Sequence, residues 1–589
     1  MVMRASFKTA LRLFKKHLTR LLTIVAIVIV SVGFMSGIGE VQGRINFAAN
    51  KYYRDQNMPD FYIKSARPMG FTANEISEIE EVANGTLLKS LCFEEKKENS
   101  DKIFRVYQYA LDSDVNQLEI IEGELPKEGE VLAERATVDY AEYTVGDKVT
   151  VMGTEYTVSG ICINPMLLLR MNERSFQYEE EYLSGVFYLN SQPMIVNDLY
   201  YSIRNRTLFD AYSEKYKTAI EQEKSELCDI LGENATVLTL YENEGFYAID
   251  SYAEKVGQIG IIFVVFFLLV TLLVVYSTMS RLFDEERGQI ACMKTLGYSD
   301  IQIVGKYVLF VTIATLVGGA IASVVGLGLT YIIYVAFGIQ YDMPPFPAGS
   351  KLIYYFSTFA IILVATLLLT LFTGLKLTRG KPAALLTPKA PKMGKKVILE
   401  RVKFIWNRLS FKHKSTARNV LLFKGRFFMT VVSLIGSSVL VLAGLGLTDN
   451  VVKVDNAESI LSISIALIVF SAMLCALVVY NLTNINVSER TREIATLMVL
   501  GYSDREVTTY IFREVYLLGF IGAILGLPFG YLLIDFVFNF INFGNVADIN
   551  WWSWILAPLI TMFFCCLSTL LLYRKIIKTD MNASLKTLE

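Results

Sequence analysis

Residues 285–300 read EERGQIACMKTLGYSD, and residues 489–504 read ERTREIATLMVLGYSD. The initial glutamates coincide, as do the Ile-Ala pairs and the whole string Leu-Gly-Tyr-Ser-Asp. Each copy follows a long apolar run, and these runs share the triplet Val-Val-Tyr at 274–276 and 478–480. Apolar runs resemble one another because Leu and Val fill them, whereas a polar loop has no such reason to repeat. We therefore infer an internal duplication and predict a function for the repeated polar segment.

The composition indicates a membrane protein that carries one soluble insert. The chain is 53% hydrophobic and only 19% charged, and its mean hydropathy is +0.41, so it is more apolar than a typical soluble protein. The net charge of −1 hides a strong segregation. Residues 42–255 contain 38 acidic and 21 basic side chains, which leaves the rest of the chain strongly basic. A solvated acidic surface is the simplest account of this segment, and cationic partners are a weaker alternative.

Eight apolar runs are long enough to cross a bilayer, which requires about 20 residues for roughly 30 Å of hydrocarbon. They cover residues 21–40, 257–279, 306–336, 352–376, 427–448, 460–482, 510–536 and 553–573. The first run follows basic residues, as in a signal peptide, but no small-x-small cleavage pattern comes after it. It is therefore predicted to be a retained helix.

The distribution of Lys and Arg predicts the orientation of these spans. Residues 376–426 contain fifteen basic residues and one acid, Glu400, and both ends of the chain are basic as well. Short basic segments stay in the cytoplasm. Both termini and both repeated loops are therefore expected in the cytosol, and residues 41–256 outside it.

Four spans per copy make the two halves parallel repeats, because an even number of spans returns the chain to its starting side. The predicted fold class is a membrane all-α protein of eight transmembrane helices, with one extracytoplasmic α/β (α+β) domain inserted after the first helix. The expected first half comprises a cytosolic elbow helix and first span (1–40), the inserted domain (41–256), and spans two to four with the first loop at 280–304 (257–380). A basic linker with a second elbow (381–426) and the second repeat with its loop at 483–508 (427–589) follow.

The inserted domain has the pattern of short strands and a few helices. Residues 130–161 alternate apolar and polar side chains between glycine turns, which is typical of strands. Residues 207–231 and 242–256 have helical patterns, and the latter is expected to continue into the second span. The odd number of cysteines, Cys92, Cys162 and Cys228, argues against a disulfide framework, and buried free thiols are expected. No pocket is recognisable from the sequence of this domain.

These motifs carry a resemblance to a known family. A span, the pattern E-R-x-x-E-I-A-x-x-x-x-L-G-Y-S-D and a glycine-rich span are similar to the permease domain of the FtsX/MacB superfamily of ABC transporters. The segments VLAE, VGDKVTV and YTVSGI (131–161) resemble the MacB-type extracytoplasmic core domain, and ARNVLLFKGRFF (417–428) resembles the basic elbow. The chain departs from the simple form because its second repeat has no external domain. Its first loop also has Gly288 and Gln289 in place of Arg492 and Glu493.

The resemblance implies a role for the loop, which in such permeases forms a short coupling helix docked in a groove of a separate cytosolic ATPase. Charged residues of the loop would then make polar contacts with the ATPase, and the Ile-Ala pairs would form an apolar anchor. Gly297 and Gly501 are expected to end each helix as C-cap glycines. The residues expected in coupling are Glu285, Glu286, Ile290, Ala291, Leu296, Gly297, Tyr298, Glu489, Arg490, Ile494, Ala495, Leu500, Gly501 and Tyr502. A solvated cytosolic turn is the simpler explanation of one copy, but two matching copies disfavour it.

Rows of small residues in two spans predict close helix packing. The glycines of these rows are Gly318 and Gly326 in the first half and Gly522, Gly526 and Gly530 in the second. Packing within the chain is favoured over contact with a second permease.

Several activities are excluded by what the sequence lacks. It has no P-loop motif G-x-x-x-x-G-K-[ST], so this chain is not expected to be an enzyme that hydrolyses ATP by that machinery. Its two histidines, His17 and His413, lie in basic elbows and form no triad or metal site. No cofactor, metal or nucleic-acid partner is expected.

The predicted function is a permease subunit of an ABC transporter in a bacterial cell (plasma) membrane. ATP hydrolysis by two copies of a cytosolic ABC ATPase would move the external domain, for export or extraction of a peptide, lipoprotein or drug. The alternative is an ATP-independent signalling platform whose external domain binds a peptide, lipoprotein or cell-wall hydrolase. An ion-driven transporter is disfavoured, because the repeats are parallel and the centres of the spans lack charge.

Overall fold

The structure, a computed structural model, describes most of the chain. The described residues are 12–82, 85–97, 101–170, 173–178, 181–203, 210–347, 353–386, 414, 418, 424–453 and 458–577. They divide into two compact units. The helical unit comprises Met1–Glu40, Val256–Ile333 and Lys351–Glu589, and the sheet unit comprises Val41–Lys255 and Tyr334–Ser350. The predicted linker 381–426 lies largely outside the described residues, as does His413.

Eight helices of the described residues are long and apolar enough to cross a membrane, so the predicted fold class of eight spans is confirmed. The first repeat uses α2 (Leu18–Asp55), α6 (Glu244–Glu285), α8 (Asp300–Gln340) and α9 (Ile353–Thr378). The second repeat uses α14 (Lys424–Val451), α15 (Glu458–Glu489), α17 (Asp504–Ile541) and α18 (Trp551–Ile577).

Three helices of the first repeat are longer than the predicted spans. α2, α6 and α8 have 38, 42 and 41 residues, so at 1.5 Å per residue each is roughly twice as long as the hydrocarbon core is thick. The expected continuity of 242–256 with the second span is found, since α6 begins at Glu244. α2 continues past residue 40 because Val41, Ile45 and Tyr52 recur at helical spacing and are buried.

The two repeats contact each other through apolar side chains and a few small polar groups. Phe34 of α2 stacks on Phe267 of α6 with ring centroids 4.3 Å apart, and it lies 5.4 Å from Phe470 of α15. Asn481 of α15 donates a hydrogen bond from Nδ2 to Thr278 Oγ1 of α6 at 3.0 Å. Such a paired amide orients the repeats without placing a charge in the bundle.

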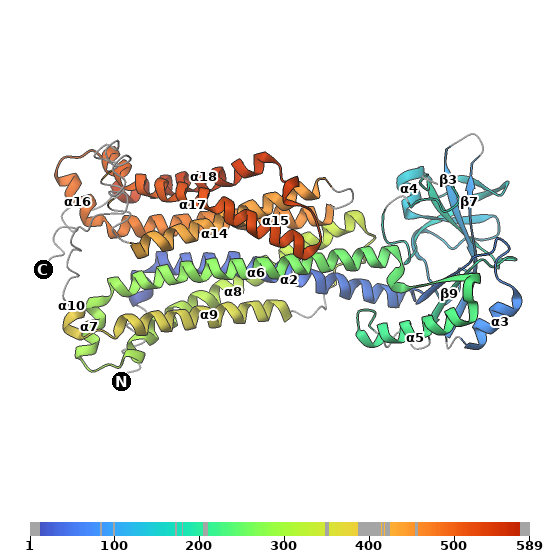
Figure 1. Ribbon diagram of the computed structural model, residues 1–589, viewed down its shortest axis with the longest axis horizontal. Coiled ribbons are helices and arrows are strands. Elements are labelled where there is room, and N and C mark those ends of the chain that lie inside the picture. Colours follow the sequence, from blue (N-terminus) through green and yellow to red (C-terminus); the bar gives the residue numbers. More distant parts are fainter. Residues whose placement is uncertain are drawn as a thin grey trace. The chain divides into compact units, whose positions relative to one another are not determined.

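The sheet unit contains a mixed ten-stranded sheet (Figure 1). Its strand order is β10-β1-β9-β2-β3-β8-β5-β7-β4, and β6 pairs with β7. The strands are β1 (Phe61–Ser65), β2 (Gly85–Lys96), β3 (Ile103–Tyr109), β4 (Glu119–Gly123), β5 (Glu130–Glu134), β6 (Lys148–Val151), β7 (Thr154–Ile163), β8 (Gly185–Asn190), β9 (Asp198–Ile203) and β10 (Ala235–Thr239). The helices α3 (Ala73–Val82) and α5 (Glu214–Leu231) belong to the same unit.

The long strand β2 joins two parts of this sheet. Its residues 85–90 pair with β9, and its residues 91–96 pair with β3. One hydrophobic core includes Tyr107, Tyr188 and Tyr200, and another includes Val106 and Phe187. Val106 and Tyr107 are adjacent on β3, as are Phe187 and Tyr188 on β8, so the two cores lie on opposite faces of the sheet. β2 changes partner near its middle, where segments distant in sequence meet.

One local prediction for this unit is wrong. Within 130–161 the strand pattern is interrupted by α4 (Arg135–Ala141), which the alternation did not indicate. Thr137 and Ala141 are buried and four residues apart, a spacing that satisfies one face of a helix. The helix ends at Glu142, whose φ of 61° is left-handed.

The cysteines of the sheet unit are free. Cys92 and Cys162 are buried, as expected, whereas Cys228 on α5 is exposed. Burial raises the pKa of the Cys92 and Cys162 thiols, which makes both poor nucleophiles.

Candidate functional site

Each copy of the repeated segment forms a short helix at the same end of the helical unit (Figure 1). α7 (Arg287–Thr295) follows α6, and α16 (Thr491–Val499) follows α15. Both have nine residues, and each is followed by the next membrane span after a short turn.

The two helices end in the same hydrogen-bonded turn. Gly297 has a φ of 88°, its N–H donates to Lys294 O at 3.0 Å, and the N–H of Tyr298 donates to Met293 O at 3.1 Å. The corresponding bonds after α16 run from Gly501 to Met498 and from Tyr502 to Leu497, and the φ of Gly501 is also 88°. These are Schellman motifs, so both glycines hold the helix-ending position that the sequence predicted.

The serine of the repeated string begins the next span. The backbone N–H of Ser503 donates to Glu506 Oε2 at 3.0 Å, which completes a capping box at the start of α17. Ser299 makes the equivalent bonds with Gln302 before α8. The glycine and serine of Leu-Gly-Tyr-Ser-Asp are therefore explained by backbone geometry alone.

The Ile-Ala pairs do not have the position expected for a docking surface. Ile290 and Ala291 are at most 2% exposed, and Ile494 and Ala495 are fully buried. Ile494 packs in a cluster with residues of α17 and α18, including Phe512. These side chains hold the short helices against the chain's own bundle, so we revise the expectation that they anchor an ATPase directly.

The exposed apolar surface lies instead at the turn that follows each helix. Leu296 is 76% exposed and Leu500 is 70% exposed, at the same position of the two Schellman motifs. Val499 and Tyr502 are also exposed beside Leu500. Neither backbone geometry nor internal packing requires a leucine at this position. The repeated leucine is therefore the residue of the motif that the fold does not explain.

The first short helix is tied to the N-terminal segment by charged groups. Glu286, at the junction of α6 and α7, is 1% exposed and accepts hydrogen bonds from Lys16 Nζ at 2.8 Å and His17 Nε2 at 3.0 Å. Burial alone would raise the pKa of Glu286, but the bonds from His17 and Lys16 lower it to about 2. The neighbouring Glu285 pairs with Arg20 of α2. The start of α7 is thus fixed to the predicted elbow region.

The second junction uses the opposite charge. Arg490 lies at the position equivalent to Glu286, is buried, and pairs through Nη2 with the buried Glu514 of α17. Glu493 lies 3.9 Å from Arg490 and accepts a hydrogen bond from Tyr510 at 3.0 Å. Arg490 is therefore committed within the chain rather than offered to a partner. The side chain of Glu489 lies outside the described residues.

The predicted glycine rows lie where spans approach closely. A Cβ added at Gly526 of α17 would lie 2.7 Å from Ser438 Cβ of α14, and one at Gly522 would lie 2.5 Å from Leu434 Cβ. Gly530 is equally crowded by α14. These contacts are within one chain.

The first repeat has the equivalent approach between α8 and α2. A Cβ at Gly318 would lie 2.9 Å from Val28 Cβ, and one at Gly326 would lie 3.1 Å from the carbonyl oxygen of Gly33. The two repeats therefore bring their first and third spans together in the same way.

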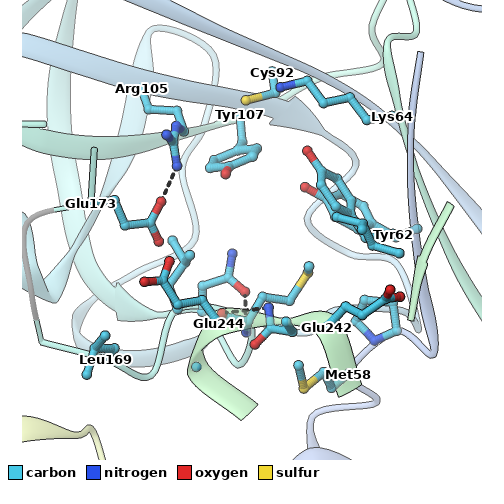
Figure 2. A pocket seen from close by; sticks show the side chains of 18 of the residues that line it. Met58, Tyr62, Lys64, Cys92, Arg105, Tyr107, Leu169, Glu173, Glu242 and Glu244 are labelled. Carbon is cyan, nitrogen blue, oxygen red and sulfur yellow. Dashed lines mark hydrogen bonds and ion pairs between the residues drawn. The ribbon is translucent and has the colours of Figure 1, made fainter. Parts of the chain in front are cut away.

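A second site, which the sequence did not reveal, lies in the sheet unit. A cavity of about 580 Å³ opens between β1, β2, β3, β9, residues 164–169 and 173–176, Tyr182 and the start of α6 (Figure 2). The expectation that this domain holds no recognisable pocket is therefore wrong. Its walls come from segments that only the sheet order brings together, so no local motif could have indicated it. Its volume is that of a pocket for a drug-sized molecule.

The described residues offer no obvious place for a metal. They contain no group of three or more His, Cys, Asp or Glu side chains arranged to hold an ion.

Comparison with known proteins identifies the two repeats. Residues 261–382 and 465–581 each match the model of the FtsX-like permease C-terminal family. Each matched segment contains one of the short helices, α7 or α16. None of the curated proteins gives a significant match. Among solved structures, the chain is similar to the extracellular domain of the noncanonic ABC-type transporter YknZ from Gram-positive bacteria. The identity is 12% over 30% of this chain and 99% of that one, with a TM-score of 0.19.

Proposed function

We propose that this chain, whose residues 261–382 and 465–581 match the FtsX-like permease C-terminal family, is the membrane subunit of an ABC transporter and docks a separate cytosolic ATPase through α7 and α16. The ATPase supplies the hydrolysis, and the permease converts it into movement of the sheet unit outside the cytosol. The exported or extracted molecule is a peptide, lipoprotein or drug.

The observation that carries this proposal is the exposure of Leu296 and Leu500 at matching turns. A solvated leucine is ordinary by itself. The same solvated leucine at the end of two equivalent helices indicates a use outside the chain, because selection for folding alone does not require it. Leu500 is flanked by the exposed Val499 and Tyr502, which extend its apolar surface. A leucine side chain gains about 1.5–3 kcal/mol when a partner buries it fully.

Two docking turns on one chain support two ATPase copies per permease. The turns share backbone geometry and leucine exposure, although the charges that fix their helices differ. We therefore expect the two turns to dock the ATPase in a similar way, although different charged groups fix α7 and α16 to the bundle.

The spans themselves favour mechanical coupling over a polar conduit. The central parts of the eight predicted spans contain no Asp, Glu, Lys, Arg or His, and the buried polar contacts between spans include small pairs such as Ser31 with Thr271, 2.5 Å apart. Charged side chains in a membrane commonly mark ion or substrate paths. Their absence from the span centres supports movement of an external domain as the output.

The direct test is the number of ATPase copies that purify with the tagged chain in mild detergent. We expect two copies with the wild type, one with Leu296→Asp or Leu500→Asp, and none with the double variant. Aspartate in place of either leucine removes the apolar side chain that docks the ATPase. Both leucines are exposed, so we expect the variants to retain the fold. Quantitative mass spectrometry of the purified complex gives the ratio.

The matched control is Leu386→Asp on α10 (Pro382–Leu386), an exposed leucine near α7 but outside the repeated turn. It should keep both copies. Retention of two ATPases by the double variant would exclude the turns as docking sites. Reproducible absence of any ATPase from the wild-type complex would instead favour the ATP-independent platform.

A further inference from the structure

The cavity of the sheet unit has two carboxylates on one side, Glu173 and Glu244 (Figure 2). Glu244, at the first turn of α6, is exposed to the cavity mouth and makes no hydrogen bond or ion pair within the part of the chain that the structure describes. Tyr62 and Lys64 lie on the opposite side. The cavity therefore has an acidic side that the protein itself leaves open.

The nearby arginine does not neutralise this side. Arg105 donates from Nε and Nη2 to Glu94 Oε1 at 3.0 and 2.9 Å, and it pairs through Nη1 with Glu173. Glu94 is fully buried and also accepts from the backbone of Phe176 at 3.1 Å. One guanidinium thus serves two carboxylates, so the group of three keeps a net negative charge.

The charges around Glu173 also favour the binding of a cation in the cavity. Burial raises the pKa of Glu173; Arg105 opposes this rise, and the charge of Glu244 adds to it. A carboxylate whose charged form is disfavoured gains when a further cation approaches. Figure 2 shows the two side chains on the same side of the cavity, where one positive group can lie between them.

The remaining walls are aromatic and apolar. Tyr62, Tyr107, Tyr200 and Phe176 line the cavity with ring surfaces. Lys64 Nζ already lies 3.8 Å from the centroid of the Phe176 ring, which shows that a cation is accommodated at such a face.

Tyr107 also faces the cavity. It is 8% exposed, and its ring reaches into the cavity (Figure 2). Its side chain has the Cys92 thiol as a hydrogen-bond partner. Tyr107 therefore contributes ring surface to the cavity.

We propose that this cavity binds a largely apolar molecule that carries an amine, with the cation between Glu173 and Glu244 and the apolar body against the tyrosines. An anionic ligand is disfavoured, because Arg105 is committed to Glu94 and Glu173 and the open carboxylate of Glu244 repels an anion. The two other cations of the lining, Lys64 and Arg174, lie over the rings of Phe176 and Tyr182.

The experiment compares two fluorescent probes of similar size and opposite charge, with the full chain in lipid nanodiscs and no ATPase present. The cation is dansylcadaverine, and the anion is the dansyl derivative of 6-aminohexanoic acid. We expect a saturable rise in dansyl fluorescence with the cation, and binding of the anion at least about tenfold weaker, a difference of about 1.4 kcal/mol. Because no ATPase is used, the result does not depend on the coupling proposal.

Variants identify the site. Glu244→Gln should weaken cation binding several-fold and keep the fold, since Glu244 is exposed. Glu173→Gln combined with Glu244→Gln should remove most of the preference for the cation. Glu78→Gln, on the exposed surface of α3, removes one charge outside the cavity and should leave binding unchanged.

Three outcomes would overturn the proposal. They are equal or tighter binding of the anion, unchanged cation binding in a folded Glu244→Gln protein, and a loss of binding in Glu78→Gln as large as that in Glu244→Gln.

Discussion

At the scale of single residues, Gly501 is fixed by its left-handed backbone rather than by space. Its φ is 88°, and no atom outside its neighbours lies within 4 Å of an added Cβ. Valine in this conformation costs about 1–2 kcal/mol or more, whereas asparagine tolerates it. We expect Gly501→Val to loosen the end of α16 and Gly501→Asn to preserve it. Hydrogen–deuterium exchange of residues 495–502 measures this, and equal exchange in the two variants would contradict it.

The buried pair of Arg490 and Glu514 makes a second prediction at this scale. Both side chains are almost fully buried. Arg490→Ala removes the guanidinium from a buried ion pair, and breaking such a pair from one side costs about 3–5 kcal/mol of unfolding free energy. An exposed pair, Lys148 with Glu155, serves as the control, and its removal should change stability by less than about 1 kcal/mol. Denaturation by SDS in mixed micelles reports both, and equal losses would refute the distinction.

At the scale of elements, the junction of α7 with the N-terminal segment predicts a dependence on pH. The pKa of Glu286 is lowered to about 2 from an ordinary value of 4.5. A depressed carboxyl pKa adds stability above the ordinary value, and this stability is lost as pH falls from 4.5 towards 2. Between pH 6.5 and pH 3.5, the unfolding free energy should therefore fall more in the wild type than in Glu286→Gln. The same fall in both proteins would show that the junction does not titrate as described.

The contact of α17 with α14 predicts how the spans respond to larger side chains. Gly526→Ile would place its Cβ 2.7 Å from Ser438, so the helices must separate. Overpacking of this type costs about 1–3 kcal/mol. Gly328 of α8 has open space around an added Cβ, and Gly328→Ile is the matched control. The thermal unfolding midpoint should fall for the first variant only; a similar fall in both would mean that glycine is needed for another reason.

At the scale of the whole molecule, two native cysteines test the predicted orientation. Cys228 on α5 of the sheet unit and Cys292 on α7 are both exposed. If the inserted domain is extracytoplasmic and α7 is cytosolic, as the charge distribution predicts, a membrane-impermeant maleimide labels Cys228 in intact cells. Cys292 reacts only after permeabilisation. Cys228→Ser removes the first signal, and labelling of Cys292 in intact cells would reverse the assigned topology.

The features that could be predicted from the sequence are those that local sequence patterns encode. The eight spans follow from apolar run length, and the turns at Gly297 and Gly501 follow from a glycine beyond a short helix. The burial of Ile290 could not be predicted, because the apolar face of a short helix beside a membrane can pack either on a partner protein or on its own bundle. The sequence pattern is the same in both cases. α4 was missed because Thr137 and Ala141 satisfy helical and alternating patterns alike.

The cavity could not be predicted, for a different reason. Tyr62, Arg105, Glu173 and Glu244 come from four separate segments. They meet through a sheet whose order does not follow the sequence, with β1 between β10 and β9 and β2 shared by two parts. Single residues with no local motif give no sign that they will face one another.

The solvated leucines also have a consequence for the cell before any complex exists. If the turns dock an ATPase, as proposed, a permease made in excess of that ATPase leaves Leu296 and Leu500 uncovered at two helix ends. Uncovered apolar surface of this type favours self-association and recognition by quality-control proteases. The amount of mature protein should therefore follow the supply of its partner, so that subunit balance is enforced by turnover as well as by synthesis.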